Sequence, residues 1–257
     1  MKLKSVDKAI SILDCFSIEG QILSVGDISA ITGFTKSTVS RLLSTFEQRG
    51  CVEKAQGFGK YRLGYRILLW GNSIKNQMNL ATIPLPIMKR LRDECNEEVV
   101  IYVVEGLKRL CIQRVGSFHE IEKVSRVGAY YPLHAGAAGK LLLAFLPKDK
   151  QEAFFSSGSL EKLTDKTITD LDTLKKDLQL IRKKGYAVSS GEREPGAFSV
   201  NAPIRNSKSS VIACLSVSGP LFRLTDNKLE KYIHEVLSAA KEISKRLGYI
   251  EDAKTVK

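Results

Sequence analysis

The sequence predicts an α+β protein with a small N-terminal winged-helix domain and a larger C-terminal domain in which helices pack on a sheet. Three observations lead to this prediction. Helical periodicity dominates the first fifty residues, two short strand patterns around a glycine-rich turn follow, and helices then flank a series of β-branched strands. We place the domains at 1–64 and 81–257, with a linker helix over 65–80 between them.

The composition indicates a globular protein with a polyanionic partner. The 257 residues include 40 Lys and Arg against 28 Asp and Glu, a formal net charge of +12, which suits nucleic acid or an anionic membrane. The N-terminus lacks the apolar run of a signal peptide, and no segment is apolar and long enough to span a bilayer. Five cysteines without a CxxC pair argue against a disulfide framework or a structural zinc site. We therefore expect a cytoplasmic protein.

A first helix is predicted over residues 5–17. Val6, Ile10 and Leu13 recur at helical spacing after Ser5, which is a suitable N-cap. We expect this amphipathic helix to end near Gly20, because glycine commonly follows the last helical turn.

Two further helices are predicted around a tight turn. The first covers 24–31, with Ser24 as its cap, and stops at Gly33. The second covers 35–47 and has one apolar stripe. The stripe consists of Val39, Leu42, Leu43 and Phe46.

The outer face of residues 35–44 in this helix carries hydroxyls and cations and no acid, which fits the second helix of a helix-turn-helix motif. Lysine and hydroxyl groups near a helix N-terminus can meet phosphates, and arginine or serine can reach base edges. Strands over 51–55 and 60–63, around the turn at 56–59, predict a β-wing. The residues expected to contact DNA are Ser24, Thr35, Lys36, Ser37, Thr38, Ser40, Arg41, Ser44, Lys54 and Lys60. The alternative is a helical subdomain whose polar face is merely solvated.

The linker helix carries more apolar side chains than a small winged helix needs. They are Ile67, Leu68, Trp70, Ile74 and Met78. We expect this helix to pack against another protomer, with an internal contact between domains as the alternative. The proline-containing stretch 81–86 interrupts it.

The second domain alternates between helices and strands, which predicts a sheet with helices packed on it. Helices are expected over 84–95, 136–145, 148–156, 170–184 and 226–247. Strands are expected over 98–104, 110–115, 122–127, 186–190, 197–204 and 210–217, with a loop over 128–132.

Residues 134–141, HAGAAGKL, invite comparison with a phosphate-binding P-loop. His134 replaces the first glycine, and Leu141 replaces the hydroxyl that would bind magnesium, so the motif fails twice. The small residues leave two alternatives open: exposed N–H groups that hold an anionic small molecule, or close packing of a helix on the sheet.

Four serines lie in or beside the later strands: Ser189, Ser199, Ser216 and Ser218. Ser216 and Ser218 share a sheet face and could bind a polar ligand, with simple solvation as the alternative. We find no nucleophile elbow, no Cys/His pair and no convincing carboxylate pair, and His119, His134 and His234 lack metal-ligand spacing. We therefore expect no enzyme activity, no metal and no cofactor.

At this point the sequence resembles the IclR family of bacterial transcription regulators. The matching stretches are SVDKAISILDCF, VGDISAITGFTKSTVSRLLSTFEQRGCVEK, YRLGYRILLWGNS, YYPLHAGAAGKLLLAFLP, GYAVSSGEREPGAFSVNAPI and LSVSGPLFRLTD. They cover nearly the whole chain in the family's order. The resemblance implies a dimerisation linker helix, dimers that often pair into tetramers, and a GAF-like or profilin-like effector-binding domain.

The resemblance also implies an effector pocket at the Gly/Ala turn and three later strands. The residues expected at the effector site are His134, Ala137, Ala138, Ser189, Glu192, Ser199, Ser216 and Ser218. Of these, His134 is expected to cap the pocket loop as a structural histidine, and a solvated loop carboxylate is the alternative for Glu192. Three positions depart from common family patterns: Ser189 is acidic in some members, Ser199 is often Cys, and Asn201 replaces a small residue. These departures bear on which effector is bound.

The sequence therefore predicts a bacterial, nucleoid-associated transcription factor that binds a pseudo-palindromic operator in double-stranded DNA as a homodimer or homotetramer. Most family members are repressors, so we expect repression that a small organic acid modulates, such as a keto acid, a sugar acid or an aromatic acid. An activator of the same family is one alternative. An enzyme-derived or ligand-free interaction domain fused to a DNA-binding domain is another. Membrane binding loses its support.

Overall fold

The chain folds into two compact units, Met1–Met78 and Asn79–Lys257, each with its own hydrophobic core. The computed structural model describes residues 3–16, 21–55, 59–77, 79–157 and 160–250. The expected end of the first helix at 17–20, the centre of the wing turn at 56–58 and Met78 lie outside the described residues.

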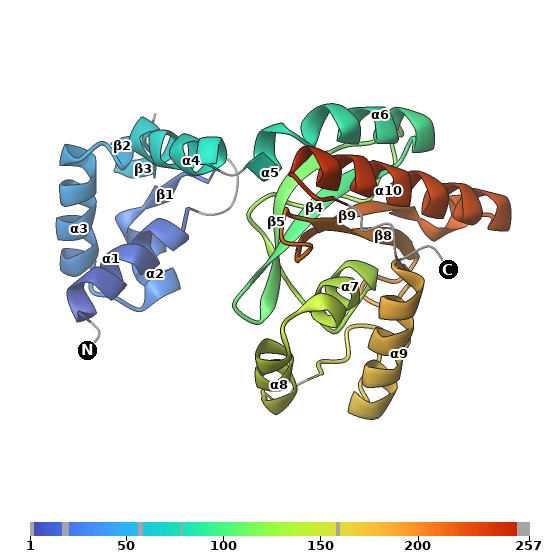
Figure 1. The fold of residues 1–257 in the computed structure, drawn as a ribbon. Helices are drawn as coiled ribbons and strands as arrows, with labels where there is room; N and C mark the ends of the chain where they lie inside the picture. Colours follow the sequence, from blue (N-terminus) through green and yellow to red (C-terminus); the bar gives the residue numbers. More distant parts are fainter. Residues whose placement is uncertain (1–2, 17–20, 56–58, 78, 158–159, 251–257) are drawn as a thin grey trace. The chain divides into compact units, whose positions relative to one another are not determined.

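The first unit contains the predicted helix pair (Figure 1). Its first three helices are α1 (Lys4–Asp14), α2 (Val25–Thr32) and α3 (Lys36–Gln48). A reciprocal capping box of Ser24 and Asp27 starts α2, and Gly33 ends it in the left-handed region at φ 72°. The hydroxyl of Thr35 caps α3. The helix-turn-helix prediction is confirmed, and α1 ends earlier than expected.

A three-stranded antiparallel sheet completes the wing. Its order is β1 (Leu23–Ser24), β3 (Lys60–Leu63), β2 (Val52–Lys54). The strand pair β2 and β3 agrees with the predicted wing. The sequence does not reveal β1, because a strand of two residues has no alternation to detect and its partner lies far along the chain.

The apolar stripe of α3 forms the centre of this unit's core. Val39 and Leu43 are fully buried, whereas Leu42 and Phe46 are half-buried. The stripe packs with Ile12 of α1 and other buried side chains, so the polar face of α3 faces solvent.

Helix α4 (Tyr65–Gln77) presents an apolar face to solvent within the described chain. Tyr65 is 75% exposed, Leu68 57%, Leu69 65% and Trp70 50%. Arg66 anchors the start of the helix by donating to the carbonyl of Arg49 at 2.8 Å. That another protomer covers this face stays a prediction.

The second unit is a six-stranded antiparallel sheet in the order β6-β5-β4-β9-β8-β7. The strands are β4 (Glu98–Glu105), β5 (Lys108–Val115), β6 (Tyr130–Pro132), β7 (Ala187–Ser190), β8 (Ala197–Arg205) and β9 (Val211–Pro220). The helices are α5 (Asn79–Thr82), α6 (Leu85–Cys95), α7 (Ala137–Phe145), α8 (Lys148–Ser156), α9 (Leu171–Lys184), the 3₁₀ helix η1 (Leu221–Arg223) and α10 (Asp226–Arg246).

Helices cover both faces of this sheet: α6 and α10 lie on one face, and α7 with α9 on the other (Figure 1). On the α10 face the ring of Phe198 stacks on that of Tyr232 with centroids 5.8 Å apart. Because both faces are covered, Val99, Val100 and Ile101 are all fully buried. The α+β prediction is confirmed.

The predicted strand over 122–127 is wrong, and the predicted loop over 128–132 contains a strand instead. Residues 122–126 have no regular secondary structure, and the edge strand is β6, within the expected loop 128–132. The segment's polar groups turn toward a buried carboxylate instead of a neighbouring strand: the N–H of Ser125 donates to Glu98 at 2.6 Å. Alternating residue types cannot reveal such a side-chain partner.

Gly139 lets α7 approach the chain just before it. A Cβ at this position would lie 2.6 Å from the carbonyl oxygen of Leu133 and 2.8 Å from that of Pro132. Real Cβ atoms essentially never come so close to backbone atoms. Of the two alternatives for the small residues, the structure therefore favours close packing at Gly139.

We expect Gly139→Ala to destabilise the second unit by about 1–3 kcal/mol, because the added methyl group forces α7 away from the backbone. Urea unfolding of the full chain, followed by circular dichroism, measures this. Gly26→Ala in α2 is the matched control, since its Cβ meets only the Ser24 hydroxyl at 3.5 Å. An unchanged unfolding midpoint for Gly139→Ala would contradict the packing role.

Candidate functional site

The outward face of α3 is an acid-free surface of hydroxyls and cations. The side chains exposed on it are Thr35, Lys36, Ser37, Ser40, Arg41 and Ser44, with Thr38 half-buried. The first acid in the helix is Glu47, in its last turn. The N-terminal turns therefore combine unpaired backbone N–H groups with positive charge, which favours an anion.

Two of the hydroxyls assigned to DNA contact also cap helices. The Thr35 hydroxyl accepts the N–H of Thr38 at 3.4 Å and lies 3.2 Å from that of Ser37. Ser24 donates from its N–H and its hydroxyl to Asp27, each at 2.8 Å, and these bonds hold the pKa of Asp27 below its ordinary value. Ser24 and Thr35 thus fix where the two helices begin.

A groove between α1 and α3 extends the basic surface. Its lining residues are Lys4, Ser5, Lys8, Thr38, Ser40, Arg41, Leu42, Ser44 and Thr45. The sequence did not predict Lys4, Ser5 and Lys8 as groove residues, because the apolar positions of α1 indicate only a helix that packs on the core. The available signal was the spacing of Lys4 and Lys8, which places both on one face of α1.

The two wing lysines, Lys54 and Lys60, are exposed, but nearby acids partly offset their positive charge. Lys54 Nζ lies 3.4 Å from Glu47 Oε1, and Lys60 lies close enough to Asp27 to contribute to its lowered pKa. Their charge is therefore less available than that of Lys36 and Arg41.

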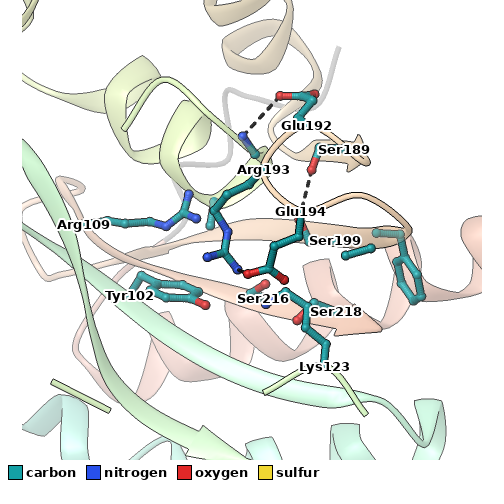
Figure 2. Close-up of a pocket in the computed structure, with 14 residues that line it drawn as sticks. Tyr102, Arg109, Lys123, Ser189, Glu192, Arg193, Glu194, Ser199, Ser216 and Ser218 are labelled. Atoms are coloured by element: carbon teal, nitrogen blue, oxygen red, sulfur yellow. Dashed lines mark hydrogen bonds and ion pairs between the residues drawn. The ribbon is translucent and has the colours of Figure 1, made fainter. Parts of the chain in front are cut away.

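The second unit contains a polar cavity on the α7 side of the sheet (Figure 2). Of the residues predicted to bind an effector, those that line it are Ala138, Ser189, Glu192, Ser199, Ser216 and Ser218. The structure thus brings together side chains from α7, β7, the following loop, β8 and β9. His134 and Ala137 are not among the lining residues.

A row of polar side chains crosses the sheet below the cavity. Strand register pairs Ser189 with Ser199, Ser199 with Ser218, and Ser218 with Glu98. The Ser189 and Ser199 hydroxyls lie 3.3 Å apart, and the Ser218 hydroxyl donates to Glu98 Oε2 at 3.1 Å. Cross-strand pairing therefore explains how serines far apart in sequence form one surface.

His134 and Ala137 support the cavity from outside. His134 is buried, and its Nε2 lies 2.9 Å from the carbonyl oxygen of Glu161, which ties two loops together. The N–H of Ala137 donates to the Ser189 hydroxyl at 3.0 Å and so orients it. Both residues therefore stabilise the surroundings of the cavity without lining it.

Glu192 faces the start of α7. It accepts from Lys140 Nζ at 2.7 Å and from the N–H of Gly136 at 3.2 Å. Lys140 is buried and also pairs with Asp177 at 2.8 Å. This carboxylate therefore fastens the loop after β7 to α7.

Charged and aromatic side chains that the sequence did not predict as effector-binding residues also line the cavity. They are Tyr102, Arg109, Lys123, Arg193 and Glu194. Arg193 and Glu194 follow Glu192 directly, so the same motif contained them. No signal in the sequence marked the other three, because they come from strands and loops whose facing direction depends on the sheet's pairing.

Burial changes the electrostatics of two of these cations. Desolvation lowers the pKa of Lys123, whose Nζ lies 3.7 Å from Glu98 Oε2 and 3.1 Å from the Ser125 hydroxyl. It also lowers the pKa of Arg109, which donates from Nη1 to the carbonyl of Ala135 at 3.1 Å.

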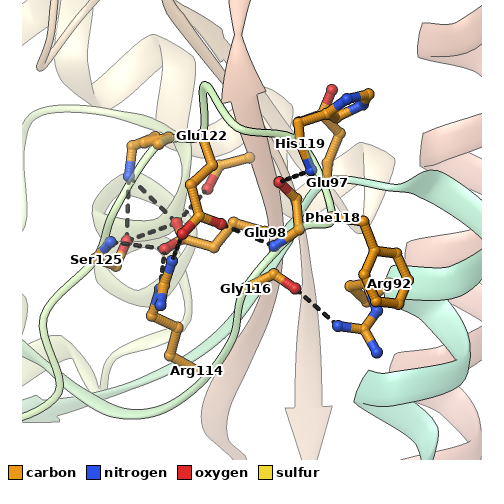
Figure 3. Close-up of polar contacts among 12 residues, drawn as sticks. Arg92, Glu97, Glu98, Arg114, Gly116, Phe118, His119, Glu122 and Ser125 are labelled. Atoms are coloured by element: carbon orange, nitrogen blue, oxygen red, sulfur yellow. Dashed lines mark hydrogen bonds and ion pairs between the residues drawn. The ribbon is translucent and has the colours of Figure 1, made fainter.

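The carboxylate of Glu98 is fully buried and accepts a hydrogen bond from Ser218, which lines the cavity; Figure 3 shows its other polar contacts. It accepts from Arg114 Nε at 2.7 Å and from both the N–H and the hydroxyl of Ser125. Arg114 also donates to Glu122 at 2.5 Å. This network fixes the segment that carries Lys123.

The described residues contain neither a metal-binding cluster nor a membrane-spanning helix. Within the described ranges no three His, Cys, Asp or Glu side chains gather into a metal-binding cluster. Among the described helices, none combines the length and hydropathy that a bilayer crossing requires.

The comparisons with known proteins cover nearly the full length. Residues 73–245 match the family model of the bacterial transcriptional regulator IclR C-terminal domain, and residues 5–56 match that of the IclR helix-turn-helix domain. HTH-type transcriptional regulator KipR of Bacillus subtilis is 29% identical over 96% of this chain and 98% of its own. The transcriptional repressor IclR of Escherichia coli is 27% identical over 96% and 91%.

A solved structure is also similar. An IclR homologue from Microbacterium hydrocarbonoxydans, crystallised with 4-hydroxybenzoate, superimposes with a TM-score of 0.84. It is 26% identical and covers 95% of this chain and 98% of its own.

We expect Cys111 and Cys214 to resist thiol reagents in the folded protein. Burial raises the pKa of each to about 12, so at pH 8 each is ionised roughly a thousand times less often than a free thiol with a pKa of about 8.5. Raising the pH should speed their labelling. Iodoacetamide labelling mapped by mass spectrometry measures it, with guanidinium-unfolded protein as the control. Equal rates in the two states would contradict this assignment.

Proposed function

Because the chain belongs to the IclR family of bacterial transcriptional regulators and carries its DNA-binding domain, we propose that it is a repressor whose operator binding responds to a small organic acid in the cavity of the second unit. Members of this family are regulators and not enzymes. The acid-free face of α3 is the single observation that carries the DNA part of this proposal.

In this proposal α3 is the recognition helix. Lys36, near its N-terminus, meets phosphate, where the unpaired N–H groups of the first turn add to the attraction. Arg41 lies further along the same outward face and reaches base edges in the major groove. The lysines lining the groove between α1 and α3 add phosphate contacts beside it.

We propose that two or four copies act together. The exposed apolar face of α4, which includes Leu68, Leu69 and Trp70, supports a protomer contact, since such a patch is costly to leave in water. A two-fold dimer implies a pseudo-palindromic operator with half-sites about 34 Å apart or a multiple of that. The protein then acts in the bacterial cytoplasm, on the nucleoid.

The cavity supports the ligand part of the proposal. Its lining combines serine hydroxyls with three cations, Arg109, Lys123 and Arg193, which suits an anionic metabolite. The 4-hydroxybenzoate complex of the Microbacterium relative shows that a member of this fold takes an aromatic acid. The name of the Escherichia coli relative supports repression, while an activator is the alternative within the family.

A ligand-free interaction domain is the main competing interpretation for the second unit. It predicts small residues at the start of α7 that serve packing alone, which fits Gly139. The charged side chains that converge on the cavity favour a ligand instead, because packing alone gives no reason to bury them.

We expect Arg41→Ala to weaken operator binding by about 1–3 kcal/mol, or roughly 5- to 150-fold, because a base-reading contact is lost. Fluorescence anisotropy with operator DNA at fixed salt measures this. Lys183→Ala, which removes an exposed cation from α9, is the control and should have little effect. The logarithm of wild-type affinity should also fall steeply with that of salt concentration. Unchanged affinity for Arg41→Ala would refute its role, and a flat salt dependence would refute DNA binding through this surface.

We expect Leu68→Glu to shift the protein toward monomers, because it places a charge in the proposed protomer contact. Leu68 is 57% exposed within one chain, so the substitution leaves the fold of the unit intact. Analytical ultracentrifugation over a concentration series measures the change. Leu180→Glu on α9, at a position 46% exposed, is the control. An oligomeric state identical to wild type would exclude this face from the interface.

A further inference from the structure

The cavity of the second unit is closed in this structure. Its free volume is about 30 Å³, which holds a single water molecule. The loop over 191–196, between β7 and β8, covers it, and the Arg193 and Glu194 side chains extend from this loop toward Ser216 in Figure 2. Ser216, on β9, is only 2% exposed. A ligand larger than water therefore needs a movement of this loop to reach Ser216.

Both ends of the loop are fastened to the rest of the unit. At one end the carbonyl of Glu192 accepts the hydroxyl of Thr167 at 2.7 Å. At the other end the carbonyl of Gly196 accepts the N–H of Leu221 at 2.6 Å. The middle of the loop, residues 193–195, is therefore the part whose movement breaks the fewest of these bonds.

Residues of the same loop also line a second, larger hollow. Gly191, Pro195 and Gly196 line this hollow of about 510 Å³ together with the segment over 162–166. Gly191 and Gly196 have φ angles of 75° and 74°, in the left-handed region that glycine adopts without strain. The loop thus has both adjacent space and a flexible residue near each end.

The middle of the loop makes a contact that reaches across the sheet. The Arg193 guanidinium lies over the ring of Tyr131, with its Cζ 4.5 Å from the ring centroid. Tyr131 belongs to β6, and β6 and β7 are the two edge strands of the sheet. Because Arg193 follows β7 and lines the cavity, this contact joins both edges of the sheet beside the cavity. The backbone holds the middle less firmly, since the carbonyl of Glu194 accepts the N–H of Ala197 at 3.3 Å, longer than an ordinary bond.

Like charges oppose this closed position of Arg193. Burial is the main cause of the lowered pKa of Arg109 and of Lys123, and the positive charge of Arg193 lowers both further. Glu194 partly offsets the charge of Arg193, because their side chains pair at 2.5 Å. That pair lies within the loop and moves with it. The ring of Tyr131 therefore supplies attraction that the closed position needs.

We propose that the loop over 191–196 is a lid and that the stacking of Arg193 on Tyr131 is the latch that holds it closed. Opening moves residues 193–195 toward the second hollow, leaves the hydrogen bonds at the two ends intact, and exposes Ser216. The inference rests on the proposed function for the lid's role, which is to admit the effector. The lid itself is a property of the chain without a ligand.

Thiol labelling measures the opening without a ligand. Ser216→Cys places a thiol of similar size in the cavity, and iodoacetamide labelling of the full chain is followed by tandem mass spectrometry. The wild-type chain gives the background from Cys214, which lies on the same tryptic peptide. We expect the introduced thiol to react about tenfold or more slowly in the folded chain than in guanidinium-unfolded protein. Equal rates show an open cavity and overturn the lid.

Two variants at Tyr131, each made in the Ser216→Cys chain, test the latch. Tyr131→Leu removes the ring, so labelling should accelerate by about 5- to 30-fold, the range expected for a largely desolvated cation–π contact. Tyr131→Phe keeps the ring and loses only the hydroxyl, which accepts the N–H of Arg126 at 3.3 Å, so its labelling should stay as slow as that of the parent. Identical rates in the two variants overturn the latch.

A second thiol separates lid opening from general loosening of the unit. Cys95 is buried at the end of α6, away from the loop, so it reacts only when the unit unfolds. In Tyr131→Leu its labelling should remain slow while that of the introduced thiol accelerates. Acceleration of both thiols by the same factor assigns the effect to unfolding and overturns the latch.

Variants at Arg193 test the other partner of the contact. Lysine keeps a cation that can lie over the ring, whereas glutamine is of similar length and neutral, so Arg193→Gln should accelerate labelling more than Arg193→Lys. The rates are compared for the thiolate, taken from the pH dependence of labelling, because a lost cation also changes the pKa of the introduced thiol. If Tyr131→Leu does not fold, this pair decides: equal rates overturn the latch.

Operator binding separates the lid from the proposed function. If an organic acid changes operator affinity but the two Tyr131 variants label alike, the effector proposal stands and the latch fails. If Tyr131→Leu accelerates labelling but no acid changes the operator affinity of the wild-type chain, the lid stands and the effector proposal fails.

Discussion

The buried carboxylate of Glu98 is the interaction that joins three parts of the second unit beside the cavity. It lies on β4 and bonds to Arg114 of β5, to Ser125 of the following segment and to Ser218 of β9. A full negative charge in this position is tolerable because several donors surround it. The segment over 122–126 is therefore held against the sheet without a strand of its own, and Lys123 reaches the cavity from it.

Charge is used in two physically different ways in this chain. On α3 the cations are exposed and cheap to keep in water, and their proposed value lies in the counterions that a polyanion releases. In the cavity Arg109 is buried and the side chain of Lys123 is only 11% exposed, so the charge of each must be balanced locally. Lys123 has Glu98 nearby, whereas Arg109 has aromatic rings and one carbonyl. The formal net charge of +12 does not distinguish these two roles.

Coverage of apolar surface explains the organisation of each unit. The sheet of the second unit is covered on both faces, and its central strands β4 and β9 are buried along most of their length. In the first unit α1, α2 and α3 bury one stripe of each helix against a common core. Helix α4 differs, because its apolar side chains face solvent within one chain. This exposed apolar face is the packing observation behind the proposed protomer contact.

The family resemblance pointed to the serines that line the cavity, while the helix pair, the wing strands and most elements of the second unit could be predicted from the residues alone. These follow from local causes: Ser24 and Thr35 are caps, Gly33 ends a helix, and Val39 and Leu43 repeat at helical spacing. Tertiary structure alone decided the rest. β1 exists only because Tyr61 lies beside it, and the segment over 122–126 follows Glu98 instead of forming a strand. Arg109 and Lys123 could be recognised as cavity residues only in the folded chain, because strand pairing and the course of the segment over 122–126 bring them to the cavity, which their residue types alone do not reveal.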